Sequence, residues 1–267
     1  MANPVFVSPQ VLVEGHPTDL ADLGVGQVAV FTGGEARHAR KVMRLKRGEP
    51  LDLVDGVGTR VVAEVYDLPE GAEEALTVRA TEVLREESPS PQVTLVQALA
   101  KGARGEQAVE TATEVGVDRF VPWVADRSIS RWKPAKYGAG QQRWQRVADA
   151  ASKQSRRAHF AKVDAPVNTA ALTATLREAS GRGDTILVCH EDAVTPLSEA
   201  LAGVTDGGDF GGRVWLVVGP EGGFSSQETE AFQRAGGQLV KLGSNILRAS
   251  TAGPAAMAAL NTIFGRW

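Results

Sequence analysis

The chain has 267 residues, of which 43% are hydrophobic and 23% are charged, and its formal net charge is −3. This size and balance are typical of a globular protein with one large or two ordinary domains. A single cysteine, Cys189, excludes a disulfide framework and a multi-cysteine zinc site, and no apolar run has the length of a membrane span or a signal region, so we expect a cytoplasmic protein.

Residues 1–85 are predicted to form a small β-rich domain, either a barrel or a sandwich. Its expected strands are short runs rich in Val and Thr, bounded by Gly, Asp and Pro, at residues 4–8, 27–32, 51–56, 59–68 and 75–84. One helix is expected at residues 35–45, where Arg37, Arg40, Lys41 and Arg44 have the spacing of a single helical face. The charged, Pro- and Ser-rich stretch 85–92 is predicted to be a linker.

Residues 86–267 are predicted to form a second domain, of the α/β class. Strands are expected at residues 93–99, 119–125, 185–191, 214–219 and 238–243. Helices are expected at residues 106–116, 141–155, 225–237 and 251–264. This alternation of strands and helices is typical of a mainly parallel sheet.

The stretch VGPEGGFSSQE, residues 218–228, joins one of these strands to a helix. In an open α/β sheet, ligands bind beyond the carboxyl ends of the strands. Gly219, Gly222 and Gly223 would let a ligand approach the backbone, while Ser225 and Glu228 have the spacing of a capping box. A tight turn followed by a helix cap, with no ligand, fits these residues equally well. The stretch has neither the Walker pattern nor the dinucleotide-binding pattern, so we do not expect a phosphate-binding loop.

A second loop, KLGSNILRASTAG at residues 241–253, also joins a strand to a helix. Lys241 and Arg248 flank a Gly-Ser-Asn turn, Thr251 is a candidate cap of the last helix, and Pro254 suits the first turn of that helix. If the two strands are neighbours, the two loops converge on one pocket.

A third strand end, LVCHEDA, places His190 and Glu191 next to Cys189. A lone histidine at a strand end more often has a structural role than a catalytic one. Cys189 is predicted to be a small buried hydrophobic residue.

Positive charge is concentrated in two windows of this acidic chain. Residues 127–157 contain nine Lys or Arg and one acid, and residues 37–47 contain six Lys or Arg and no acid, so the rest carries about −17. Such clusters favour a polyanionic partner, although the first helix could simply have a solvated face. Trp132, Tyr137 and Trp144 among the cations suit unpaired RNA, with Trp144 expected in the core. The predicted RNA-binding residues are Arg37, Arg40, Lys41, Arg44, Arg127, Arg131, Arg156 and Arg157.

The two loops together closely resemble the paired signature loops of the ribosomal RNA small subunit methyltransferase E family, one of the SPOUT class of S-adenosylmethionine (SAM) enzymes. The resemblance extends to HARKVMRLKRGEPLDLVDG near the N-terminus and to QALAKGARGEQAVETATEVGVDRFVPWVADRS and RWQRVADAASKQSRR in the middle of the chain. It implies an α/β fold with a C-terminal SPOUT-type domain tied in a deep trefoil knot and an N-terminal PUA-like β-barrel. The expected domains are residues 1–85 and 86–267.

The resemblance also implies an activity: methylation of N3 of one uridine in small-subunit ribosomal RNA, by a homodimer that uses SAM and no metal. Arg248 is predicted to stabilise negative charge on the uracil, and Glu221 and His190 both remain candidates for the proton acceptor. Arg248 and Glu221 are therefore the predicted catalytic residues. The predicted cofactor-binding residues are His190, Leu216, Gly219, Glu221, Gly222, Gly223, Leu242, Gly243, Ile246, Leu247 and Ala252.

One position departs from the family pattern. Where Leu-Arg-Thr-Glu-Thr-Ala is expected, residues 247–252 read Leu-Arg-Ala-Ser-Thr-Ala, so Ser250 replaces the acidic residue. We interpret the acidic residue as a cap of the last helix, a role that Ser250 could also fill. The alternative is a lost catalytic carboxylate. Two rival functions stay open: an inactive RNA-binding assembly factor with the same fold, which Ser250 alone favours, and a SPOUT methylase that acts on another RNA position, against which the GPEGG stretch argues.

Overall fold

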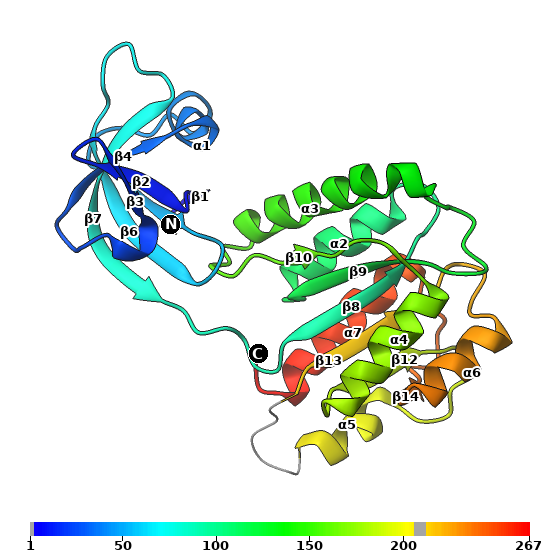
Figure 1. The fold of residues 1–267 in the computed structure, drawn as a ribbon. Coiled ribbons are helices and arrows are strands. Elements are labelled where there is room, and N and C mark those ends of the chain that lie inside the picture. The colour runs from blue at the N-terminus through cyan, green and yellow to red at the C-terminus, as the bar shows by residue number, and fades with distance from the viewer. Residues whose placement is uncertain (1–2, 206–211) are drawn as a thin grey trace. The chain divides into compact units, whose positions relative to one another are not determined.

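The computed structural model describes residues 3–205 and 212–267, which form two compact units (Figure 1). The first unit comprises Met1–Ser88 and Ser152–Phe160, and the second comprises Pro89–Ala151 and Ala161–Trp267. The chain therefore leaves the first unit at the linker and returns to it for one short segment.

The first unit is built on a seven-stranded sheet with the order β1-β5-β6-β7-β4-β2-β3, in which β1 and β5 are parallel and the other pairs are antiparallel. Residues of β6 alternate between buried and half-buried positions, as expected of a strand with one face on a core. The strands are β1 (Val5–Val7), β2 (Gln10–Val13), β3 (His16–Asp19), β4 (Val28–Thr32), β5 (Pro50–Val54), β6 (Thr59–Asp67) and β7 (Ala75–Arg85).

The helix of the first unit is shorter than the basic pattern predicts. A single α-helical turn, α1 (Gly34–Arg37), continues as a π-helical turn, η2 (His38–Val42), and Arg44 beyond it has a φ of 55°. A left-handed residue ends a helix. The predicted continuation to residue 45 is therefore wrong. A short 3₁₀ turn, η1 (Leu20–Asp22), is the other helical element described in this unit.

The returning segment is held to the β-rich unit mainly through its backbone. Phe160 N donates to Gly56 O at 2.9 Å, and Gly58 N donates to Ala158 O at 3.2 Å. Arg60 Nη2 donates to Arg156 O at 2.7 Å. A linker at 85–92 alone does not account for this segment, which carries two of the predicted RNA-binding arginines, Arg156 and Arg157.

The second unit has a parallel sheet with the order β10-β9-β8-β13-β12-β14, and β11 also pairs with β9. Central strands β8 and β13 are buried at every position, as is typical of a sheet covered on both faces. The strands are β8 (Val93–Ala98), β9 (Arg119–Val124), β10 (Lys162–Val163), β11 (Val167–Asn168), β12 (Thr185–Cys189), β13 (Val214–Val218) and β14 (Gly237–Val240).

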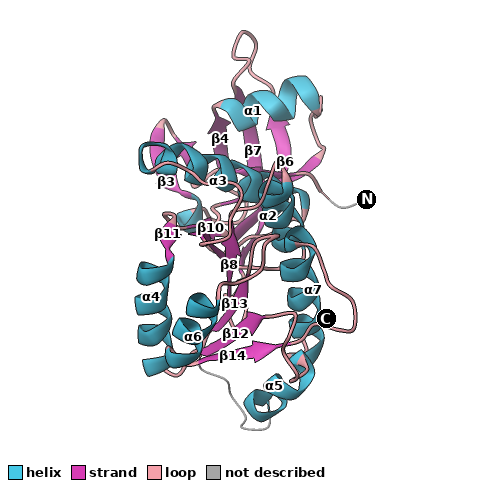
Figure 2. Ribbon diagram, turned by 90° about the vertical axis from the view of Figure 1, so that its right-hand side faces the viewer, coloured by secondary structure: helices cyan, strands magenta, loops and turns pink. Residues whose placement is uncertain are grey.

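Helices cover both faces of this sheet (Figures 1 and 2). One face packs against residues of α2 (Arg104–Glu114), α3 (Tyr137–Gln154), α5 (Leu197–Thr205) and α7 (Ala249–Ile263). The opposite face packs against residues of α4 (Thr169–Gly181) and α6 (Ser226–Arg234). The prediction of an α/β domain with a parallel sheet is confirmed.

Two helices of this unit were missed in the sequence. α4 has Leu172, Leu176 and Ala179 buried at helical spacing, so its apolar periodicity was a usable signal that its Thr-rich composition obscured. α5 follows the third strand end and packs Leu197 and Leu201 into the core. A 3₁₀ turn, η3 (Pro134–Lys136), leads into α3.

Candidate functional site

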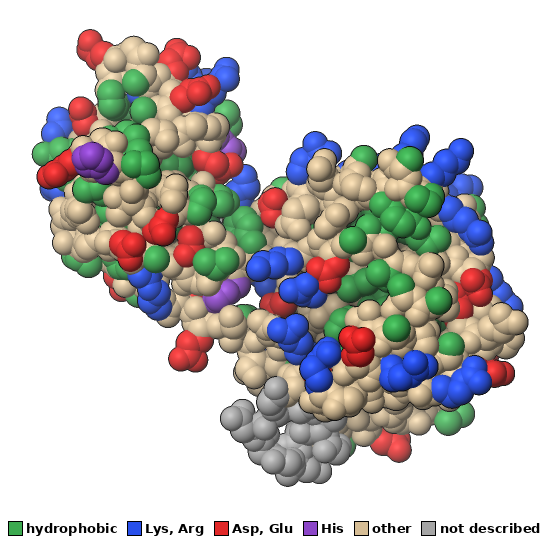
Figure 3. Space-filling view, viewed as in Figure 1, with side chains coloured by type: hydrophobic (Ala, Val, Ile, Leu, Met, Phe, Trp, Pro, Cys, Tyr) green, Lys and Arg blue, Asp and Glu red, His purple; other side chains and the backbone are tan. Residues whose placement is uncertain are grey.

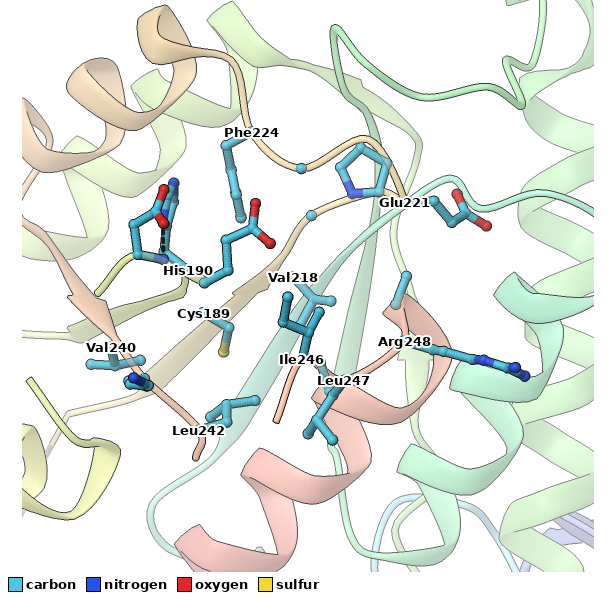
Figure 4. A pocket seen from close by; sticks show the side chains of 18 of the residues that line it. Cys189, His190, Val218, Glu221, Phe224, Val240, Leu242, Ile246, Leu247 and Arg248 are labelled. Atoms are coloured by element: carbon cyan, nitrogen blue, oxygen red, sulfur yellow. Dashed lines mark hydrogen bonds between the residues drawn. The ribbon is translucent and has the colours of Figure 1, made fainter. Parts of the chain in front are cut away.

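A pocket of about 990 Å³ opens where β12, β13 and β14 end (Figure 4). These strands are neighbours in the sheet, so the three loops that follow them converge, as the sequence predicts. Each loop lines the pocket through a continuous segment, at residues 189–192, 218–224 and 240–249. Arg127 and Ala252 contribute from the loop after β9 and from α7.

Part of the pocket wall is apolar. Cys189, Val218, Val240 and Leu242 cluster on one side of the view in Figure 4. The side chains of Glu221 and Arg248 both extend to the other side, away from this cluster (Figure 4).

The loop after β13 is shaped by close packing at Gly219. A Cβ on Gly219 would lie 2.8 Å from Cε2 of Phe224, whose ring stacks on His190 with centroids 5.5 Å apart. Gly223 has a φ of 68°, which a side chain disfavours. The predicted capping box is confirmed, since Ser225 and Glu228 satisfy each other's backbone N–H groups at the start of α6. Phe224 was missed in the sequence, because nothing along the chain predicts its stacking on His190.

His190 lines the pocket, but its ring is already engaged. Nδ1 accepts a hydrogen bond from Asp192 N at 3.1 Å, and the ring stacks on Phe224. In a neutral imidazole that accepts through Nδ1, the proton sits on Nε2. The accepting nitrogen, Nδ1, is therefore occupied by Asp192 N and is not free to take a proton from a substrate.

Glu221 projects toward the loop after β8. Its carboxylate accepts hydrogen bonds from Lys101 N at 3.1 Å and from Arg104 Nη1 at 3.0 Å. Partial burial raises the pKa of Glu221, but hydrogen bonds from its own backbone, from Lys101 and from Arg104 outweigh this effect and hold the pKa below its usual range. The carboxylate is thus suited to fix a loop and is a weak base.

Arg248 is exposed and precedes α7 as its N-cap residue, with φ −66° and ψ 153°. Its guanidinium has no hydrogen bond or ion pair with any residue that the structure describes. No side chain caps α7, so the interpretation of Ser250 or Thr251 as its cap is wrong. Ser250 is buried within the first turn instead, and Pro254 lies in the second turn.

All but one of the predicted cofactor-binding residues line the pocket. Leu216 is the exception, because its side chain is fully buried in the core between the sheet and α7. Val218, two residues further along the same face of β13, reaches the pocket in its place. The residues that the structure brings together are His190, Gly219, Glu221, Gly222, Gly223, Leu242, Gly243, Ile246, Leu247 and Ala252.

Basic side chains of α1 and η2 pair with an acidic loop, residues 68–74, that joins β6 to β7. Lys41 Nζ lies 2.6 Å from Glu73 Oε1, and Arg37 Nη1 lies 3.6 Å from Glu74 Oε1. Arg40 donates to the carbonyls of Pro69 and Ala72 in the same loop and to that of Ala75 at the start of β7. Arg40 is therefore structural, and the positive charge counted along the chain is partly neutralised by residues distant in sequence.

The second basic window divides between surface and core. Trp144 is buried as expected, so its ring is not placed to stack on RNA. Trp132 is half-buried and packs edge-to-face on Trp144 with centroids 5.3 Å apart, and Arg143 lies over its ring. Arg131 is tied to the carbonyls of Asp126 and Ser128. Lys and Arg side chains stand out among few acidic ones on the face of the second unit seen in Figure 3. Of the predicted RNA-binding residues, Arg127 alone lines the pocket.

Comparison with known proteins agrees with this arrangement. Residues 86–261 match the RNA methyltransferase domain family and residues 31–72 match the RNA methyltransferase PUA domain family. The ribosomal RNA small subunit methyltransferase E of Mycobacterium bovis is 39% identical over 242 residues, covering 91% of this chain and 89% of the relative. The chain belongs to the ribosomal RNA small subunit methyltransferase E family.

Further members of the family agree with this assignment. The Synechocystis member is 29% identical over 98% of this chain and 78% of its own length. A crystal structure of the Neisseria gonorrhoeae member bound to S-adenosyl methionine is 25% identical, covers 98% of both chains and superposes with a TM-score of 0.78. The resemblance seen in the two loops is thereby confirmed, and so is the fold of a PUA-like domain followed by a SPOUT-type domain.

None of the described helices combines the length and hydropathy required to cross a bilayer. No group of three or more His, Cys, Asp or Glu among the residues of the described ranges could hold a metal ion.

Proposed function

We propose that the chain transfers a methyl group from SAM to N3 of a uridine in small-subunit ribosomal RNA. The observation that supports this most directly is the convergence of the two family signature loops on one pocket, in a fold shared with a SAM-bound family member. The choice of N3 and the residue roles given below rest on chemical reasoning about the residues of the pocket.

The pocket is suited to SAM in size and in chemistry. Its volume of about 990 Å³ is at the upper end of the range of about 300–1,000 Å³ for small-molecule sites. The apolar side chains near Cys189 suit an adenine ring, and Gly219, Gly222 and Gly223 offer backbone groups to the polar ends. When bound, SAM supplies a methyl group on a sulfonium leaving group. Cys189 is half-buried at the pocket wall and not fully buried as expected from the sequence. Loss of water around its sulfur raises the pKa of the thiol to about 12, which makes it a weak nucleophile.

Arg248 is the residue best placed to act on the uracil. Methylation at N3 requires loss of the N3 proton, which puts negative charge on the ring and its oxygens. An exposed guanidinium at the pocket, with no partner among the described residues, can stabilise that charge as it develops. Neither Glu221 nor His190 is arranged as a good proton acceptor, which leaves solvent as the simplest acceptor.

The RNA must present an unpaired or flipped-out uridine, because pairing hides N3. We assign Arg127 to the RNA at the pocket mouth, and Arg37, Lys41, Arg44 and Arg156 to phosphate contacts elsewhere. Arg40, Arg131 and Arg157 are weaker candidates for such contacts, because their guanidinium groups donate to backbone carbonyls.

We also propose the homodimer and the trefoil knot that the family resemblance implies. Ile246 lines the pocket with 80% of its surface exposed, and Val194, in the loop after β12, is 90% exposed. Apolar side chains this exposed beside a functional pocket suit burial by a second copy. Sedimentation equilibrium of the full chain tests the dimer.

The function is tested by methyl transfer from labelled SAM to small ribosomal subunits that lack their own base methylation, followed by nucleoside analysis. A single 3-methyluridine is the expected product. Methylation at another position of the RNA would favour a SPOUT methylase of different specificity. Tight binding to the particles without transfer would favour an inactive assembly factor.

Replacing Glu221 with glutamine is expected to lower kcat by only about threefold to tenfold, because a carboxylate with a lowered pKa is a poor general base. Ionised Glu221 stabilises the fold above its ordinary pKa of 4.5, and this contribution is lost as the pH falls through its lowered value. The pH profile of transfer between about pH 6 and about pH 9 should therefore keep its shape in Glu221→Gln. A loss of about 1,000-fold with an altered profile would instead identify Glu221 as the proton acceptor.

Neutralising the acidic loop is expected to tighten RNA binding. In the double variant Glu73→Gln/Glu74→Gln, Arg37 and Lys41 lose their ion-pair partners and become free to meet phosphates. We expect affinity for a ribosomal RNA fragment to rise by about twofold to fivefold at low salt, with a steeper salt dependence. Fluorescence anisotropy over a salt series measures both quantities. Glu70→Gln, in the same loop, is the matched control. If it raised the RNA affinity equally, Glu73 and Glu74 would not be competing specifically with phosphates for Arg37 and Lys41.

A further inference from the structure

Glu228 is a buried carboxylate that the proposed chemistry does not use. It lies on α6 with no exposed surface. Burying a charged group is costly unless hydrogen bonds satisfy its oxygens. The capping box accounts for one oxygen only, since Glu228 Oε2 accepts from Ser225 N at 2.9 Å. The second oxygen, Oε1, therefore needs hydrogen-bond donors outside the capping box.

That second oxygen binds two other segments of the second unit. Oε1 accepts from Asp126 N, in the loop after β9, at 2.8 Å. It also accepts from Thr169 Oγ1, at the start of α4, at 3.0 Å. Ser225 Oγ adds a direct link by donating to Asp126 Oδ2 at 2.9 Å. One carboxylate thus joins the loop after β13, the loop after β9 and the start of α4.

The loop that Glu228 holds carries Arg127. This residue follows Asp126 directly, lines the pocket and donates from Nη1 to Gly222 O at 3.4 Å. A Cβ on Gly222 would lie 3.0 Å from Arg127 O, so the two loops are in close contact. The place of Arg127 at the pocket therefore depends on how the two loops are fixed to each other.

We propose that Glu228 is a positioning residue for the RNA substrate: its carboxylate fixes the loop after β9 against the loop after β13, so that Arg127 is held at the pocket mouth. The proposal rests on the function proposed above. Glutamine at this position tests it sharply, because an amide has one acceptor oxygen where Glu228 offers two. The amide nitrogen must then face either Asp126 N or Ser225 N, donor against donor. Ser225 keeps its hydroxyl cap on the Glu228 backbone, so the pocket loop stays anchored.

The experiment is a double-mutant cycle on the full-length protein with Glu228→Gln, Arg127→Ala and both together, using small ribosomal subunits as substrate. Glu228→Gln is expected to raise KM for the subunits about tenfold, with the SAM Kd within about threefold of wild type. The double variant should be no worse than Arg127→Ala alone, because Glu228 acts through Arg127. Glu178→Gln, an exposed change on α4, is the control and should match wild type.

The outcomes separate this proposal from the function on which it rests. Absence of methyl transfer by wild type would overturn the proposed function and this role with it. Transfer by wild type combined with multiplicative effects of the two changes would overturn the role of Glu228 alone. If Glu228→Gln does not fold, Asp126→Pro removes the backbone N–H that Glu228 Oε1 accepts, and it should raise KM in the same way. An unchanged KM in that variant would also overturn the proposal.

Discussion

Replacing Arg248 with alanine is expected to lower kcat for methyl transfer by about 100- to 1,000-fold, with the SAM Kd within about threefold of wild type. The guanidinium is exposed at the pocket, so its removal buries no unpaired group. α7 begins at Ala249 without a side-chain cap, so the helix does not depend on this residue for its start. The loss should therefore fall on the reaction and not on the fold.

Single-turnover methyl transfer and titration calorimetry with SAM separate the two effects. Arg234→Ala is a matched control, because this arginine of α6 is also exposed and makes one surface ion pair, with Glu230. It should leave both quantities close to wild type. An equal fall in kcat and in SAM affinity for Arg248→Ala would assign the guanidinium to the cofactor and remove it from the proposed charge stabilisation.

The parallel sheet could be predicted because its strands are buried on both faces. Residues 214–218 are apolar at every position and residues 93–98 at four of six, and such runs are typical of a sheet under two layers of helices. The capping box at Ser225 and Glu228 was also predictable, since both partners lie within four residues. Helix caps and buried strands can thus be predicted from short stretches of the sequence.

Interactions between distant segments could not be predicted in the same way. Lys41 meets Glu73 across 32 positions of sequence, so a charge count along residues 37–47 overestimates the free positive charge. Glu228 binds Asp126 across 102 positions, which no local motif indicates. Leu216 was predicted from the family resemblance, and a motif does not give the point at which the strand meets the pocket: Leu216 is buried, and Val218 lines the pocket.

Gly219→Ala is expected to lower SAM affinity by about 10- to 100-fold, because a crowded loop resists even one added carbon at a cost of about 1–3 kcal/mol. The new Cβ would lie 2.8 Å from the ring of Phe224. That ring is 9% exposed and is held between His190 and Trp123, with centroids 5.5 and 5.6 Å away, so it has little room to move aside. The loop backbone must shift instead, and this backbone is what the cofactor is proposed to contact. Calorimetry with SAM, together with thermal melting, measures the effect, and Gly138→Ala, whose Cβ meets nothing within 4 Å, is the control. A lowered melting temperature with unchanged SAM affinity would show that the loop relaxes away from the pocket, and the assignment of Gly219 to the cofactor would then fail.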